Sequence, residues 1–174
     1  GRAGMKHAAL GDDETTRSGL FFEAVRIIKE MRENDRESGR SVQLLRPRYA
    51  VYENVNGAVS SNKGNDWKAV IESLIQIVQP EIPDIPIPDG GWPNVGSFCG
   101  VGEDGVPFSV AYKLHDAQWG GVAPRRKRLC LLVDYAGFTA PWILFDPQFE
   151  RTSESGEPVQ IERDTLPKPR PEIQ

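Results

Sequence analysis

The run Tyr49–Val55 is the feature of this sequence that most constrains the fold. It reads Tyr-Ala-Val-Tyr-Glu-Asn-Val, a short apolar strand that brings a carboxylate and an amide to its C-terminal end. In open α/β sheets, ligands bind beyond the carboxyl ends of the strands. The run therefore predicts a strand of an α/β sheet, with Glu53 and Asn54 at a candidate functional edge.

Both polar residues also have plainer interpretations. Glutamate is usually a solvated surface residue. From its position alone, a functional role for Glu53 and an ordinary surface role are about equally well supported. Asparagine after a strand often bonds to its own backbone in a turn. For Asn54 the turn role and a functional role are compatible.

Two amphipathic segments flank this strand. The spacing of apolar residues predicts one helix from Thr15 to Glu33 or Asn34 and a second from Asn65 or Asp66 to Pro80, which ends it. The expected buried stripe of the first helix is Leu20, Phe21, Ala24, Val25, Ile28 and Met31. That of the second is Trp67, Val70, Ile71, Leu74, Ile77 and Val78.

The second half of the sequence adds two further strands. Residues 79–96 are rich in proline and predict an extended surface loop. Residues 108–114 alternate in the manner of a strand, and residues 129–133 form a continuous apolar strand. About three strands and two main helices are thus expected, in the order of the second half of a doubly wound α/β sheet, with the last two strands paired antiparallel. We expect residues 1–150 to form one partial domain and residues 151–174 to be a loop or disordered tail.

Composition excludes several classes of protein. A chain of 174 residues with a formal net charge of -4 is long enough for one core, and it is not a protein that coats nucleic acid by overall positive charge. It has no apolar run long enough for a membrane span and no signal peptide, so a cytoplasmic protein is expected. Cys99 and Cys130 are too few for a disulfide framework or a zinc site, and both are expected to be small buried hydrophobes.

Several segments together resemble the DNA cytosine-5 methyltransferases, in particular phage and bacterial members. The Glu53-Asn54-Val55 run is similar to the family motif that carries the catalytic glutamate. The matches follow the family order over residues 1–145 and comprise Arg17-Ser18-Gly19-Leu20-Phe21-Phe22-Glu23, Glu53-Asn54-Val55, Ser60-Ser61-Asn62-Lys63-Gly64 and the basic cluster Arg125-Arg126-Lys127-Arg128.

The resemblance implies a Rossmann-like fold, S-adenosyl-L-methionine as methyl donor and double-stranded DNA as partner. It implies that Glu53 contacts N3 of a cytosine flipped out of the duplex, and that Arg126 and Arg128 bond the cytosine O2 and flanking phosphates. Asn54 would organise this pocket. Leu20 would pack on the adenine ring of the donor, with Gly19 allowing close approach, although a leucine on a helical stripe is more often a core residue.

The chemistry of the reaction explains the need for such residues. C5 of cytosine is a poor nucleophile until a thiolate adds to C6 and converts the ring to an enamine. A glutamate at N3 assists this addition if it donates a proton or a hydrogen bond there, which requires a buried and protonated carboxyl group.

The sequence also departs from the family pattern. Neither cysteine lies in the Pro-Cys-Gln context of the family nucleophile, the glycine-rich donor loop is absent, and Pro124 replaces the usual glutamine of the arginine motif. His7 and His115 match no family role and are expected to be structural. We therefore expect this chain to be the C-terminal part of a catalytic domain. It is expected to be inactive alone and to act with an N-terminal part that this sequence lacks.

Two alternatives remain open. One is a non-catalytic protein, either a prophage remnant or the DNA-binding half of a split methyltransferase. The other is an unrelated nucleotide-binding α/β domain, which would need a phosphate-binding loop that this sequence does not offer. In the family the target-recognition region follows the last strand, so only its beginning could lie in residues 151–174. The target sequence and the setting, restriction–modification or phage, do not follow from these residues.

Overall fold

The computed structural model describes residues 17–116 and 127–145. In chain order its elements are helix α1 (Arg17–Glu37), the 3-10 helix η1 (Val42–Leu44), strand β1 (Tyr49–Val55), the 3-10 helix η2 (Asn56–Gly64), helix α2 (Asn65–Ile75), strands β2 (Val95–Val101), β3 (Pro107–Asp116) and β4 (Lys127–Asp134), and helix α3 (Ala140–Leu144). The N-terminal residues, half of the basic cluster (Arg125 and Arg126) and the predicted tail lie outside the described residues.

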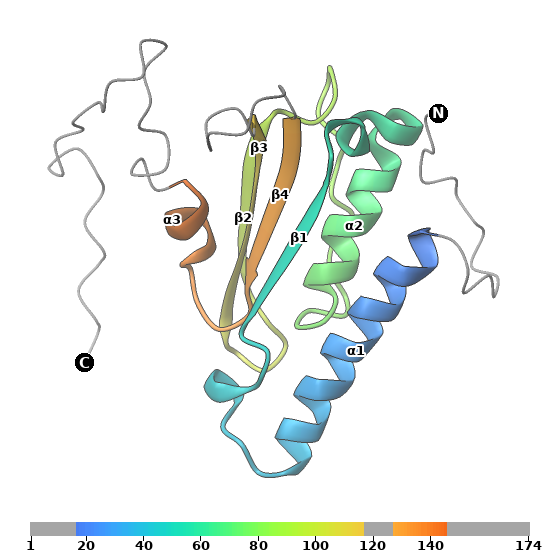
Figure 1. Ribbon diagram of the computed structural model, residues 1–174. Coiled ribbons are helices and arrows are strands. Elements are labelled where there is room, and N and C mark those ends of the chain that lie inside the picture. Colours follow the sequence, from blue (N-terminus) through green and yellow to red (C-terminus); the bar gives the residue numbers. More distant parts are fainter. Residues whose placement is uncertain (1–16, 117–126, 146–174) are drawn as a thin grey trace, which may run out of the picture.

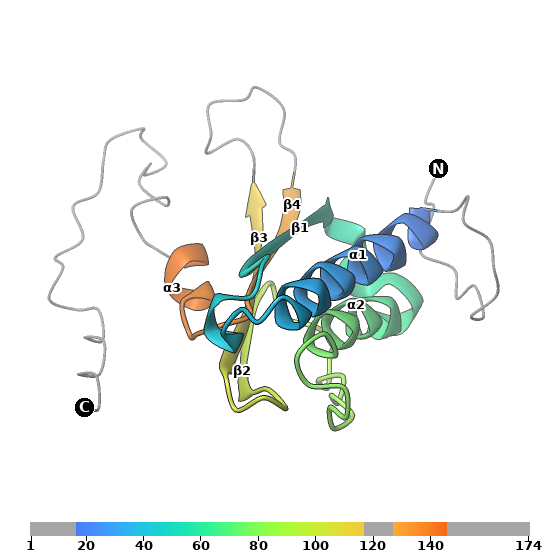
Figure 2. The same ribbon diagram turned by 90° about the horizontal axis from the view of Figure 1, so that it is seen from below.

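The strands form one sheet in the order β1-β4-β3-β2, and every neighbouring pair is antiparallel. Because β1 and β3 are both antiparallel to β4, they point the same way, and the chain passes through α2 between them. Helices α1 and α2 lie on one face of the sheet and the short α3 lies on the other (Figures 1 and 2). The predicted α/β class and the antiparallel pairing of the last two strands are confirmed. The described sheet has four strands rather than about three, and its wholly antiparallel pairing differs from the parallel pairing expected of half a doubly wound sheet.

The core fills the space between the sheet and the first two helices. Trp67 of α2 is fully buried, and its ring packs edge-on against Tyr112 of β3 with centroids 5.3 Å apart. On its other side it stacks with Tyr52 of β1 at 6.3 Å. Such aromatic contacts add to the free energy gained by removing apolar surface from water, so α2 fixes β1 and β3 relative to each other.

The predicted stripe of α1 is partly wrong. Leu20, Ala24 and Met31 are exposed, and only the other half of the stripe packs on the core. At the end of the buried face lies Arg32, whose Nη1 donates hydrogen bonds to the carbonyl oxygens of Leu45 (3.1 Å) and Pro47 (2.8 Å). The apolar arc of α1 is wider than the surface that the described sheet and α2 offer, so part of it stays uncovered.

Strand β2 was not predicted, because residues 95–101 contain two glycines that interrupt the apolar pattern. The structure gives the reason for them. A Cβ atom at Gly96 would lie 2.5 Å from the Tyr112 ring, and one at Gly100 would lie 2.7 Å from the Phe108 ring. Each glycine leaves room for an aromatic ring of β3. Cys99 lies between them and is exposed, so its predicted burial is wrong.

A buried carboxylate joins the end of β4 to α3. Asp134 is fully buried and accepts hydrogen bonds from Arg48 (2.9 and 3.2 Å), from the backbone N–H groups of Ala136 (3.0 Å) and Thr139 (3.2 Å), and from the Thr139 hydroxyl. Burial alone would raise the pKa of Asp134, but these bonds outweigh it and lower the pKa. This network closes the turn from which α3 starts.

We predict that Gly96→Ala destabilises the fold. The new methyl group must displace the buried Tyr112 ring, and overpacking of this kind costs about 1–3 kcal/mol. Urea denaturation measures the change in unfolding free energy. The control is Gly57→Ala, because a Cβ atom at Gly57 meets nothing within 4 Å. Equal stability of the two variants would contradict the assignment of Gly96 to a strand against Tyr112.

We predict that Asp134 contributes stability that is lost in acid. Its pKa is lowered in the folded protein relative to about 3.9 in the unfolded chain, so its contribution is fully present above pH 4 and falls as the pH drops through the folded pKa. Asp134→Asn should lower the unfolding free energy by about 1–3 kcal/mol at pH 7 and lose this part of the acid dependence. Denaturation at pH 7 and pH 3 tests this, and a pH dependence identical to wild type would refute it.

Candidate functional site

The cross-strand register defines which side chains share the face of the sheet opposite to α1 and α2. Directly paired residues lie on the same face of a sheet. One row across the strands contains Glu53, Cys130 and Lys113, and the next row towards the C-terminal end of β1 contains Val55, Arg128 and His115. The α3 helix packs on this face only nearer the N-terminal end of β1, over Ala111 and Leu132. We call the two rows the open face.

Two residues predicted from separate motifs meet on the open face. The Nε atom of Arg128 lies 2.9 Å from Oε1 of Glu53, diagonally across the β1–β4 ladder. The Glu53 side chain is 54% exposed and that of Arg128 is 23% exposed. The structure thus brings together the expected catalytic carboxylate and one of the two expected arginines, but the described residues do not provide the buried pocket expected around Glu53.

Asn54 lies on the other face. Its Nδ2 donates a 2.6 Å hydrogen bond to the Tyr52 hydroxyl, and its Oδ1 accepts one of 2.8 Å from the Val55 backbone N–H. The second bond is the backbone contact of the plainer interpretation. The first bond ties Asn54 to an aromatic ring of the core, so Asn54 holds the end of β1 in place while Glu53 points away from the core.

Cys130 lies directly opposite Glu53, and the sequence had assigned it no chemical role. Burial, and then the charge of Glu53, raise the pKa of the Cys130 thiol. A raised pKa keeps the sulfur protonated, whereas nucleophilic cysteines need a lowered one. Cys130 therefore has the opposite environment to a nucleophile.

Lys113 and His115 also lie on the open face, and the sequence analysis gave neither of them a chemical role. Burial lowers the pKa of Lys113, and burial followed by the charge of Lys113 lowers the pKa of His115. Strand alternation was a usable signal, because Lys113 and His115 on β3 and Arg128 and Cys130 on β4 are each two residues apart. The pairing of the two strands could not be read from the sequence.

The remaining predicted site residues are further away or outside the described part. Arg126 lies outside it. Gly19 and Leu20 lie in the first turns of α1, where Gly19 is partly buried and the Leu20 side chain is 67% exposed. The described residues bring neither of them into contact with Glu53.

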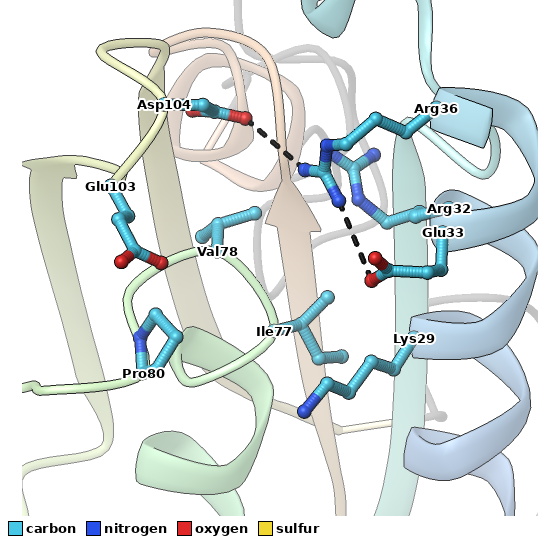
Figure 3. Close-up of a pocket in the computed structure, with 9 residues that line it drawn as sticks. All are labelled: Lys29, Arg32, Glu33, Arg36, Ile77, Val78, Pro80, Glu103 and Asp104. Atoms are coloured by element: carbon cyan, nitrogen blue, oxygen red, sulfur yellow. Dashed lines mark ion pairs between the residues drawn. The ribbon is translucent and has the colours of Figure 1, made fainter.

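A cavity of about 360 Å³ lies at the other end of the fold (Figure 3). Its walls come from the C-terminal half of α1, the segment that follows α2 and the β2–β3 turn. Arg36 forms ion pairs there with Glu33 (3.5 Å) and Asp104 (3.6 Å). The charged lining residues balance in sign, and they comprise Lys29, Arg32, Arg36, Glu33, Glu103 and Asp104. This balance offers no preference for an anion or a cation, so the open face is the better candidate site.

The described residues contain neither a metal-ligand cluster nor a membrane-spanning helix. No group of histidine, cysteine, aspartate and glutamate side chains among residues 17–116 and 127–145 is arranged to hold a metal ion. Within the same ranges, no helix combines the length and apolar character needed to cross a membrane.

The sequence model of one family matches part of the chain. Residues 6–78 match the family described as C-5 cytosine-specific DNA methylase. The match covers fewer than half of the 174 residues and includes α1, β1 and α2. It supports a cytosine-5 DNA methyltransferase domain. No curated protein and no solved structure matches the chain. Glu53 lies inside the matched part, while Arg128 reaches it from outside.

We predict that the Glu53–Arg128 ion pair contributes little to stability. Glu53 is more than half exposed, and exposed ion pairs are worth about 0–1 kcal/mol. Glu53→Gln, Arg128→Gln and the double variant should each unfold within about 1 kcal/mol of wild type, with a coupling energy of the same size. A loss of several kcal/mol in denaturant titrations would mean that the pair is structural, and the variants would then be unsuitable as functional probes.

Proposed function

We propose that this chain is part of a DNA cytosine-5 methyltransferase that transfers a methyl group from S-adenosyl-L-methionine to C5 of a cytosine flipped out of double-stranded DNA. The observation that carries the proposal is the contact of Glu53 with Arg128. It joins the strand end inside the family match to a basic strand outside it, on a face that the described residues leave open.

Glu53 has the central chemical role in this proposal. When the thiolate adds to C6, electron density moves to N3, and Glu53 donates a proton or a hydrogen bond to that atom. C5 then takes the methyl group from S-adenosyl-L-methionine, which leaves as S-adenosyl-L-homocysteine. A general base removes the proton from C5, the thiolate leaves C6 as the C5–C6 double bond re-forms, and N3 returns its proton to Glu53. Because the described residues leave Glu53 more than half exposed, the bound DNA or another part of the enzyme must exclude water from it.

Arg128 positions Glu53 and contacts the substrate. In the free protein its guanidinium group pairs with the carboxylate at 2.9 Å. When a base binds, the same group can donate to the cytosine O2 next to N3. Arg126 would be the second arginine by its place in the motif, and Asn54 keeps the strand end rigid through Tyr52.

The methyl donor supplies an electrophilic methyl group when it is bound. An exposed Leu20 side chain at the start of α1 fits apolar contact with an adenine ring, and Gly19 beside it has no Cβ atom to obstruct the approach. These two residues would hold only one side of the donor.

The nucleophile and the rest of the donor pocket must come from another segment, in the same polypeptide or in a separately encoded partner. Cys130 has a raised pKa and Cys99 lies outside the required sequence context. The surface supports such a partner, because the described residues place no strand beyond β1. Apolar side chains are also exposed on the face of β1 turned away from α1 and, separately, on α1 itself. They comprise Tyr49, Val51 and Val55 on β1 and Leu20, Ile27 and Met31 on α1.

A non-catalytic role is the second candidate. The protonated thiol of Cys130 beside Glu53 favours a chain that contacts DNA without performing the chemistry alone, such as one half of a split methyltransferase or a prophage remnant. The two candidates differ in what happens when the missing segment is supplied.

We predict that the purified 174-residue chain does not methylate DNA, and that activity appears when it is combined with a segment carrying a glycine-rich donor loop and a Pro-Cys-Gln loop. In the combined protein, Glu53→Gln should reduce methyl incorporation by about 10²–10⁴-fold, because it removes the proton donor at N3. Transfer of labelled methyl groups to DNA measures this.

The matched control is Lys29→Gln, an exposed change in the cavity at the opposite end of the fold. It should leave the rate unchanged. Steady methylation by the chain alone would overturn the need for a partner segment. Full activity of the Glu53→Gln variant would overturn the role of Glu53.

A further inference from the structure

Three basic side chains lie together on the open face, on the side of Arg128 away from β1. His115 and Arg128 are directly paired across β3 and β4, and Lys113 lies two residues before His115 on the same face of β3. All three side chains are partly buried. We call Lys113, His115 and Arg128 the basic patch.

The spacing within the basic patch suits a single small anion. Neighbouring strands lie about 4.8 Å apart, and residues two apart on a strand are separated by about 7 Å. A phosphate group above the β3–β4 ladder is therefore within reach of all three side chains at once. Glu53 lies on the far side of Arg128, so the carboxylate does not stand between the phosphate and Lys113 or His115.

We propose that the basic patch binds one backbone phosphate of the DNA, next to the flipped nucleotide, with His115 as a phosphate ligand. The inference rests on the proposed function, because it assumes that the open face receives DNA. It assigns a chemical role to His115 and Lys113, for which the sequence motifs provided none.

His115 makes this contact sensitive to pH. Among residues 17–116 and 127–145, the charged and titratable groups that share its face are Lys113 on its own strand, Arg128 and Cys130 on β4, and Glu53 on β1. In the free protein, burial and Lys113 lower the pKa of His115, so its imidazole is neutral at pH 7. A bound phosphate favours the imidazolium form and raises the pKa again.

The direction of the effect follows from linkage. If DNA binding raises the pKa of His115, the complex takes up a proton between the free and the bound pKa values. Affinity for DNA therefore increases as the pH falls through that window, by at most about tenfold per pH unit because one proton is involved. Below the free pKa the affinity becomes constant with respect to this group.

The first test is DNA binding by the complete 174-residue chain. A fluorescent double-stranded oligonucleotide is titrated at several pH values from 8 to 6 and at several salt concentrations, with anisotropy as the readout. The wild type should bind more tightly at lower pH. His115→Gln should remove most of this increase, and Lys113→Gln should reduce the slope of log affinity against log salt by about one.

Two control variants separate the basic patch from general charge effects. Lys29→Gln removes one positive charge at the opposite end of the fold. His7→Gln removes the other of the two histidines in the sequence. Both should retain the wild-type pH dependence and salt slope. If the wild type binds DNA and the His115 and Lys113 variants behave like these controls, the basic patch is wrong while the proposed contact with DNA stands.

A second readout does not depend on DNA binding. The His7→Gln variant leaves His115 as the single histidine, so its imidazole resonances can be followed by NMR during a pH titration, with and without inorganic pyrophosphate. Pyrophosphate should raise the pKa of His115. If it does so while DNA does not bind, the patch stands and the proposed function fails at its DNA contact. An unchanged pKa in the presence of both ligands would overturn the patch.

Discussion

The position of β4 between β1 and β3 is the constraint on which the rest of the structure depends. Seven residue pairs join β4 to β1 and eight join it to β3, so the residues of β4 from Arg128 to Asp134 have neighbours on both sides. A shift of one residue would turn Leu131 out of the core and move Arg128 to the wrong face. The burial of Leu131 and Val133 beneath α2 therefore fixes the contact between Arg128 and Glu53.

The two faces of the sheet divide structural and chemical tasks. On the inner face, Tyr52 and Tyr112 enclose Trp67 and hold the first and third strands at a fixed separation. On the open face, the same strands expose a carboxylate and a set of basic groups. Because consecutive residues of a strand alternate between faces, Glu53 is positioned by its neighbours Tyr52 and Asn54, which belong to the packed side.

In the free protein, the open face combines one ion pair with titratable groups whose pKa values are shifted. Arg128 pairs with Glu53. Burial and then the charge of Lys113 lower the pKa of His115, while burial and then the charge of Glu53 raise the pKa of Cys130. In the proposed complex, a DNA phosphate would favour the charged form of His115. A flipped base would take the place of the ion pair between Arg128 and Glu53. The described residues place no strand beyond β1, and apolar side chains of β1 and of α1 are exposed. In the proposed function, a partner segment at this edge would extend the sheet and bring in the groups that the chemistry needs.

The sequence by itself determined the positions of α1, α2, β1, β3 and β4 to within a few residues, because helical spacing and short apolar runs are local signals. It also singled out Glu53, Asn54 and Arg128, since these stand in recognisable motifs. It did not reveal β2, whose glycines make sense only beside the aromatic rings of β3. Nor did it reveal which half of the apolar arc of α1 is buried.

Only the tertiary structure decided that Glu53 and Arg128 meet, that Cys130 stands opposite Glu53, and that His115 lies beside Arg128. These contacts depend on the pairing of strands that are far apart in the sequence. Strand pairing is set by the packing of one whole face of the sheet against α1 and α2, to which residues all along the chain contribute, so no local pattern encodes it.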